Sequence, residues 1–180
     1  SIFNSDVNVY YEVSKYNAFY ETGILSKFGM TKFNENKEDS NSDIAYFRDT
    51  AFFEKDGKSL EMDKTDGSFH YSGGRLVSKG DITDREYYDR LGEQKLKEMK
   101  LLPENYIRNG YTSTESGSSF MYGPKFAQTL DGKKVCGAGS VSIEFYGNDK
   151  VATVVSSWVN AEYATTTKTV SFDEAFSRIK

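Results

Sequence analysis

The sequence contains only one cysteine, one histidine and two prolines in 180 residues. Because Cys136 has no second cysteine to pair with, an intramolecular disulfide is excluded, and so is a zinc site built from cysteines. No apolar run approaches the roughly 20 residues that a transmembrane helix needs, and no signal-type apolar segment is present. The sequence therefore predicts no membrane-spanning segment within residues 1–180.

The sequence also lacks a concentration of one charge. Its 23 basic and 27 acidic side chains are interspersed and give a formal net charge of −4. A nucleic-acid-binding protein needs a basic face that neutralises phosphates, so we do not expect nucleic acid as a partner. Aromatic residues are abundant: 13 Phe and 13 Tyr supply enough apolar surface for a hydrophobic core. Segments rich in Gly, Ser, Thr and Tyr favour an exported bacterial protein.

Motifs of the common enzyme classes are missing as well. There is no Gly-x-Ser-x-Gly, no His-Glu-x-x-His, no phosphate-binding glycine loop and no dinucleotide fingerprint. We expect His70 to be a structural strand residue and Cys136 a buried, unactivated thiol, with a nucleophile pair of the two as the alternative. The prediction is a non-catalytic protein without cofactor. A deep pocket that holds His70 with two carboxylates would favour an enzyme instead.

One loop matches part of a calcium site. Asp39, Asn41 and Asp43 copy the first three ligand positions of a calcium-binding loop. Ile44 then stands where the turn glycine belongs, and Thr50 where the bidentate glutamate belongs. Because these two positions do not match, we predict a solvated loop and no metal site.

Two long helices are predicted in the chain. Apolar residues three or four positions apart indicate a helix over 7–30 that ends at Gly29. A second helix is predicted to begin at a capping box of Thr83 with Glu86 and to end before Pro103, which cannot continue a helix.

Strand-like runs fill the rest of the chain, over 44–72, 106–126, 126–158 and 164–170, before a short final helix over 171–180. Within 106–126, residues 112–119 are predicted to form a polar loop. Asp56-Gly57, Asp66-Gly67 and Asp131-Gly132 are dipeptides that tolerate the positive φ of tight hairpin turns. They predict antiparallel pairing of the runs on either side.

The two halves of the chain resemble each other. Each has a helix, then strands, an Asp-Gly-Lys turn and a paired hairpin, so that residues 59–62 parallel 142–145. We therefore predict an α+β fold made of two halves, 1–80 and 81–180, each an antiparallel β-sheet packed against a helix. The halves are expected either as two modules or as one compact unit.

Over residues 44–180 the chain resembles PepSY-like modules, and among them the YycH/YycI-type regulators. The pattern is F-x-Q-x-x-D-G-x-x-V, then V-x-I-x-F-x-x-x-K-V, a Trp and S-x-D-E-A, carried here by Phe126, Gln128, Asp131, Gly132, Val135, Val141, Ile143, Phe145, Lys150, Val151, Trp158, Ser171, Asp173, Glu174 and Ala175. Residues 60–71 look like the first-half hairpin of that family.

The resemblance implies a non-catalytic, extracytoplasmic, membrane-tethered accessory protein or lipoprotein that regulates or senses by protein–protein contact. In that family the partner is a membrane sensor histidine kinase of a cell-wall regulatory system. The anchor, a lipid or a transmembrane helix, is expected upstream of Ser1. The alternative is a propeptide- or inhibitor-like module that binds a secreted protease.

Aromatic residues are the candidates for the contact with a partner. Trp158 either caps the core of the sheet or, with Tyr146 or Tyr163, forms an aromatic anchor. In the second case we expect the anchor to bind a protein or peptide, with cell-wall glycan as the alternative.

Overall fold

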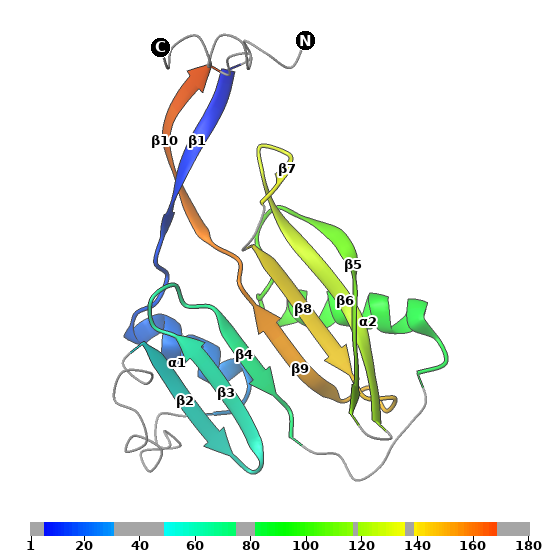
Figure 1. Ribbon diagram of the computed structural model, residues 1–180. Coiled ribbons are helices and arrows are strands. Elements are labelled where there is room, and N and C mark those ends of the chain that lie inside the picture. Colours follow the sequence, from blue (N-terminus) through cyan, green and yellow to red (C-terminus); the bar gives the residue numbers. More distant parts are fainter. Residues whose placement is uncertain (1–5, 31–48, 75–81, 117–118, 136–138, 169–180) are drawn as a thin grey trace, which may run out of the picture. The chain divides into compact units, whose positions relative to one another are not determined.

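The computed structural model describes residues 6–30, 49–74, 82–116, 119–135 and 139–168 (Figure 1). These residues belong to two compact units. We call residues 1–13 with 160–180 the ribbon unit, and residues 14–159 the sheet unit. The predicted final helix over 171–180, the loop from Asp39 to Asp43 and the residue Cys136 lie outside the described residues.

The ribbon unit pairs the strand β1 (Asp6–Val13) with the antiparallel strand β10 (Asn160–Lys168). The strand predicted near 164–170 is thereby confirmed, but the helix predicted over 7–30 is wrong in its first part. The spacing of Val9 and Val13 fits a helix, yet β-branched and aromatic residues also favour strands. Pairing with a distant segment decides between the two, and no local pattern contains that information.

The sheet unit holds an eight-stranded sheet with the order β2-β3-β4-β9-β8-β6-β5, in which β7 pairs with β6. All of its strand pairs are antiparallel. The strands are β2 (Thr50–Lys55), β3 (Lys58–Asp63), β4 (Phe69–Ser72), β5 (Tyr106–Ser116), β6 (Ser119–Leu130), β7 (Lys133–Lys134), β8 (Ser140–Phe145) and β9 (Val151–Ser156). The α+β class predicted from the sequence is confirmed.

Two of the predicted hairpin turns have the expected backbone. Asp56 and Gly57 have φ of 52° and 74°, and Asp131 and Gly132 have φ of 50° and 71°. Two consecutive positive φ values are the signature of the tight turn that suits twisted hairpins. The polar loop predicted over 112–119 is wrong, because β5 and β6 continue through most of it as paired strands.

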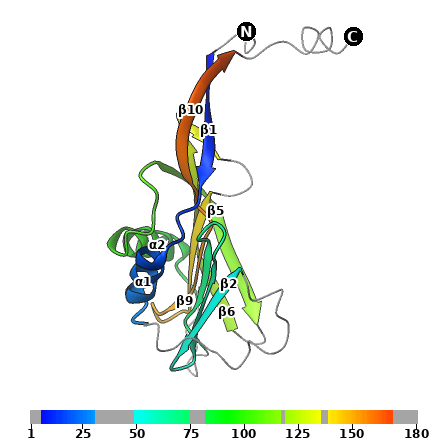
Figure 2. The ribbon, with the colours of Figure 1, turned by 90° about the vertical axis from the view of Figure 1, so that its left-hand side faces the viewer.

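The two described helices lie on the same side of the sheet (Figure 2). The helix α1 (Ala18–Lys27) begins at Asn17, whose side-chain oxygen accepts the backbone N–H of Phe19 and of Tyr20. An N-cap of this kind satisfies amides that have no partner inside the helix. The predicted helix over 7–30 is therefore correct only from residue 18 on.

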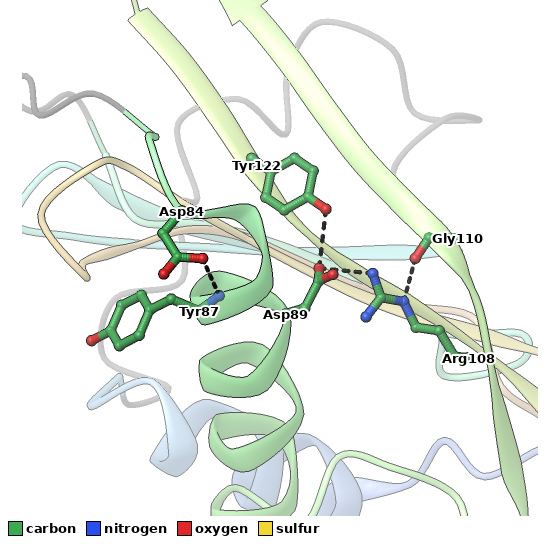
Figure 3. Close-up of polar contacts among 6 residues, drawn as sticks. All are labelled: Asp84, Tyr87, Asp89, Arg108, Gly110 and Tyr122. Atoms are coloured by element: carbon green, nitrogen blue, oxygen red, sulfur yellow. Dashed lines mark hydrogen bonds and ion pairs between the residues drawn. The ribbon is translucent and has the colours of Figure 1, made fainter.

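The helix α2 (Arg85–Glu98) begins one residue later than predicted. Asp84 is its N-cap, and its carboxylate accepts the backbone N–H of Tyr87 at 2.9 Å (Figure 3). The capping box of Thr83 with Glu86 is thus wrong by one position. A carboxylate at this position both caps the amide and interacts favourably with the positive end of the helix dipole.

Both helices end with the same hydrogen-bonding motif. The backbone N–H of Met30 donates to the carbonyl of Leu25 in α1, and that of Leu101 donates to the carbonyl of Leu96 in α2, both at 2.9 Å. This six-residue closure is the Schellman motif. All four side chains are at most 3% exposed, so each helix end is also fixed by apolar packing.

The motif requires a left-handed residue directly after each helix. Gly29 has φ of 68°, which confirms the predicted end of α1. After α2 the corresponding residue is Lys100, which has φ of 52°. The two helix ends are also joined, since the ammonium of Lys27 donates to the backbone carbonyl of Met99 at 2.6 Å.

One hydrophobic core fills the sheet unit, and both predicted halves contribute to it. Strand β4 from the first half pairs with β9 from the second. The side chains of the core include Leu25, Phe53, Leu60, Met62, Tyr88, Leu96, Ile143, Phe145 and Val154. Gly92 permits the close approach of α2, because a Cβ atom there would lie 2.4 Å from Pro124 Cγ.

Candidate functional site

Trp158, the first candidate for an aromatic anchor, is half-buried directly after β9 and packs against the hydrophobic core. The ammonium of Lys15 lies 4.2 Å from the centre of its ring and 5.8 Å from the ring of Tyr20. Lys15 also donates a hydrogen bond to the backbone carbonyl of Trp158. This cation–π cluster holds residue 15 against the end of β9.

The structure separates two of the aromatic candidates, Trp158 and Tyr146, within the sheet unit. Tyr146 lies at the turn that follows β8, and its hydroxyl donates to the carbonyl of Gly74 at 2.8 Å. Trp158 lies at the opposite end of the β8–β9 hairpin, as the pairing of Val141 with Ser156 shows. Tyr163 belongs to the ribbon unit, where it is 57% exposed.

The face of the sheet away from the helices carries a continuous row of side chains. The register places Phe52, Glu61, His70, Val155, Ser142 and Lys125 side by side on six neighbouring strands. Glu61 and His70 are exposed, and Val155 is 38% exposed. We call this surface the open face. Its cross-strand neighbours are close enough to act together on one ligand.

A hollow of about 320 Å³ lies on the open face, where β2, β3, β4 and β9 meet. Its walls carry polar side chains, namely Thr50, Glu61, Asp63, Ser68, His70 and Ser157. Phe69, Val155 and Ser156 complete the lining. We call it the His70 hollow. Among the described residues, its lining contains two carboxylates and neither lysine nor arginine.

Several polar groups of the His70 hollow are available to a ligand. Asp63 is engaged through one carboxylate oxygen, since its Oδ1 accepts the backbone N–H of Thr65 at 2.6 Å. The side chains of Glu61 and His70 have no hydrogen-bond or ion-pair partner among the described residues. A ligand that binds these two side chains therefore replaces only water molecules and breaks no hydrogen bond within the described residues, so the energetic cost is small.

The His70 hollow meets the condition for reconsidering an enzyme only in part. It does hold His70 with the two carboxylates Glu61 and Asp63. However, Glu61 and His70 are exposed, so the hollow is shallow and open to water. General acid–base catalysis and electrostatic stabilisation are strongest in sites that exclude water. The exposed positions of Glu61 and His70 do not provide this exclusion of water.

A buried carboxylate on the open face has a structural role. Glu144 is 4% exposed and accepts hydrogen bonds from the hydroxyls of Thr112 and Thr114 at 3.0 Å and of Thr153 at 2.8 Å. This bridge links β9, β8 and β5. Gly123 on the intervening strand β6 allows a close approach to β8, because a Cβ atom there would lie 1.9 Å from the carbonyl oxygen of Ile143. With its acceptors used in this way, Glu144 stabilises the sheet.

A second polar cluster fastens α2 to the sheet (Figure 3). Asp89 pairs with the guanidinium of Arg108 at 2.7 Å and accepts the hydroxyl of Tyr122 at 3.1 Å. The Arg108 Nε–H donates to the carbonyl of Gly110 at 2.6 Å. Burial, together with the neighbouring Asp89, raises the pKa of Tyr122 and keeps its hydroxyl protonated as a donor. These groups are engaged with one another and leave no site for a ligand.

Neither a metal nor a membrane is indicated by the described residues. No three His, Cys, Asp or Glu side chains in those ranges are placed to hold a metal ion. None of the helices there is both long enough and apolar enough to cross a bilayer.

The fold and the His70 hollow define a class: an α+β protein with one antiparallel sheet, helices on one face and a polar hollow on the other. No protein-family model, no curated protein and no solved structure matches the chain.

The His70 hollow was not predicted from the sequence, although part of the signal is visible there. In residues 60–63 and 69–72, apolar and polar side chains alternate, and the turn between them contains Asp66-Gly67. The observed register, with Glu61 opposite His70, places both on the open face. The contribution of β9 depends on the pairing of β4 with β9, which joins the two halves of the chain.

Proposed function

We propose that this protein is a non-catalytic binding protein that acts by contact with another protein, and that the open face around the His70 hollow is the contact surface. The observation that carries the proposal is the difference between the two faces of the sheet. Both described helices cover one face, while the other presents exposed Glu61, His70 and Val155 beside a hollow. A concave site in which a few polar groups lie beside an apolar side chain can fix the orientation of a bound group.

The resemblance to PepSY-like modules suggests the setting of this contact. The two helices end in the same Schellman motif at Leu25 and at Leu96, which supports the interpretation that the chain repeats one helix-and-sheet module. On this basis we propose an extracytoplasmic accessory protein that is tethered to the membrane. A sensor histidine kinase is the proposed partner, and a secreted protease is the alternative.

The proposal is tested by titrating the protein against purified candidates. These are the extracytoplasmic domain of a sensor kinase and the secreted proteases encoded near its gene. We expect saturable binding of one of them by isothermal titration calorimetry. Val155→Gln, which changes an exposed apolar residue of the open face, should weaken it about tenfold, as expected for a central contact residue.

Phe19→Gln is the matched control, because Phe19 is 91% exposed on α1, away from the open face. This variant should bind like the wild type. Thermal melts of both variants verify folding. Unchanged affinity of a folded Val155→Gln variant, or weakening by Phe19→Gln alone, would contradict the proposed surface.

A further inference from the structure

The charge of the His70 hollow narrows the chemistry of what it binds. Two of its side chains, Glu61 and Asp63, are carboxylates, and the described residues of its lining include no lysine or arginine that would neutralise them. An anionic ligand would be repelled by this pair. A cationic group, in contrast, would form charge-assisted hydrogen bonds, which are stronger than those between neutral groups.

The size and walls of the His70 hollow fit a single side chain. Its volume of about 320 Å³ is at the lower end of the range of about 300 to 1,000 Å³ that is typical of ligand pockets. Val155, which is 38% exposed, provides apolar contact on the open face. Lysine and arginine combine an apolar stem with a charged head, which matches an apolar wall next to carboxylates.

The acceptors of the His70 hollow are arranged on neighbouring strands. Glu61 lies on β3 directly opposite His70 on β4, and Asp63 lies two residues further along β3 on the same face. The Glu61 carboxylate has no partner among the described residues. The hydroxyls of Thr50 and Ser68, which also line the hollow, add further acceptors.

We infer that the His70 hollow binds a lysine or arginine side chain presented by the protein partner, with Glu61 and Asp63 as its counter-ions. This inference rests on the proposed function, because it identifies the group of the partner that the open face recognises. The partner is thereby expected to present a positive charge to the hollow, which the proposed contact surface alone does not specify.

The test uses the ¹⁵N-labelled full chain and two short peptides that differ in one side chain. One peptide is acetyl-Gly-Arg-Gly-amide, and the other carries citrulline, which has the shape of arginine but no charge. We expect the arginine peptide to shift the amide signals of Ser68, His70 and Val155 saturably. The citrulline peptide should bind at least about fivefold more weakly.

Glu61→Gln removes one charge without a change of shape and should weaken the arginine peptide about two- to fivefold, as expected for an exposed ion pair. Glu54→Gln is the matched control. Glu54 lies on β2 and is exposed on the open face, like Glu61, but it does not line the hollow. Equal binding of both peptides, absence of saturable shifts at the hollow, or equal effects of the two substitutions would overturn the inference.

The titrations also separate this inference from the proposed function. If Val155→Gln weakens the protein partner but the arginine peptide does not bind at the hollow, the inference is wrong and the contact surface stands. If the arginine peptide binds as described while both Val155→Gln and Glu61→Gln leave the partner unaffected, the hollow still recognises a basic side chain, and the proposed surface is wrong.

Discussion

The two faces of the sheet are built from adjacent residues that have opposite surroundings. Leu60, Met62 and Val154 face the helices and are 0% exposed, whereas their direct neighbours Glu61 and Val155 point to the open face. Because successive side chains of a strand alternate, one short sequence serves both faces. The comparison shows that the covered face provides the hydrophobic core of the sheet unit, whereas the open face exposes both polar and apolar side chains to solvent.

The largest expected effect is a difference in stability between alanine substitutions at two neighbouring phenylalanines of β2. Phe53 is 1% exposed on the covered face, while Phe52 is half-buried on the open face. Phe53→Ala should lower the free energy of unfolding by about 3–5 kcal/mol, since it leaves a cavity in the core. Phe52→Ala should cost less than about 1.5 kcal/mol. Urea unfolding followed by circular dichroism measures both, and equal losses would contradict the distinction between the faces.

A smaller effect distinguishes two glycines, one in each helix. Alanine at an exposed helix position normally stabilises a protein by about 0.5–1 kcal/mol relative to glycine. Gly23 of α1 has nothing within 4 Å of an added Cβ, so Gly23→Ala should show this gain. At Gly92 the Cβ would lie 2.6 Å from Pro124 Cδ and 2.9 Å from Ile143 Cγ2, so Gly92→Ala should cost about 1–3 kcal/mol.

Denaturant unfolding of the two glycine variants gives the sign of each change. Changes of opposite sign in the free energy of unfolding would support close packing of α2 on the covered face at Gly92 and the absence of crowding at Gly23 in α1. A stabilising Gly92→Ala substitution would show that α2 does not approach β6 and β8 as closely as described.

The smallest expected effect is a pH dependence of the folding stability, which arises from Tyr20 of α1. Tyr20 donates its hydroxyl to the carbonyl of Gly67 at 2.7 Å, and burial, together with the charge of Asp66, raises its pKa above the ordinary value of 10.0. The folded state therefore keeps this proton at a pH where the unfolded chain has lost it. The stability that Tyr20 provides is fully present below pH 10 and is lost as the pH rises through the folded-state pKa.

Tyr20→Phe should thus be less stable than the wild type at pH 8, by about 1 kcal/mol for the lost hydrogen bond. The difference between the two proteins should shrink above pH 10. Thermal melts from pH 8 to pH 11 measure this difference. A constant difference across that range would show that the Tyr20 hydroxyl is not buried in the folded protein.

Local signals in the sequence predicted part of the fold correctly. The Asp56-Gly57 and Asp131-Gly132 turns and the end of α1 at Gly29 are confirmed, because each depends on backbone conformations that few residues adopt readily. The strand β1 was missed because its assignment depends on pairing with β10 near the other end of the chain.

The candidate site was predicted less well than the fold. Trp158, Tyr146 and Tyr163 were selected by residue type alone, and the structure places Trp158 and Tyr146 at opposite ends of the β8–β9 hairpin. The His70 hollow depends on which strands are neighbours, and β9 becomes the neighbour of β4 only when the two halves of the chain share a sheet. A sequence motif describes residues that are close along the chain, so it does not reveal such a site.

The most direct measurement of the open face as a contact surface is cross-saturation NMR on the complex with the partner found by titration. The ²H,¹⁵N-labelled protein is observed while the unlabelled partner is irradiated. We expect signal loss at the amides of β3, β4 and β9, centred on Glu61, His70 and Val155, with α1 and α2 unaffected. Signal loss confined to the helices, with β3, β4 and β9 unchanged, would contradict the proposed function.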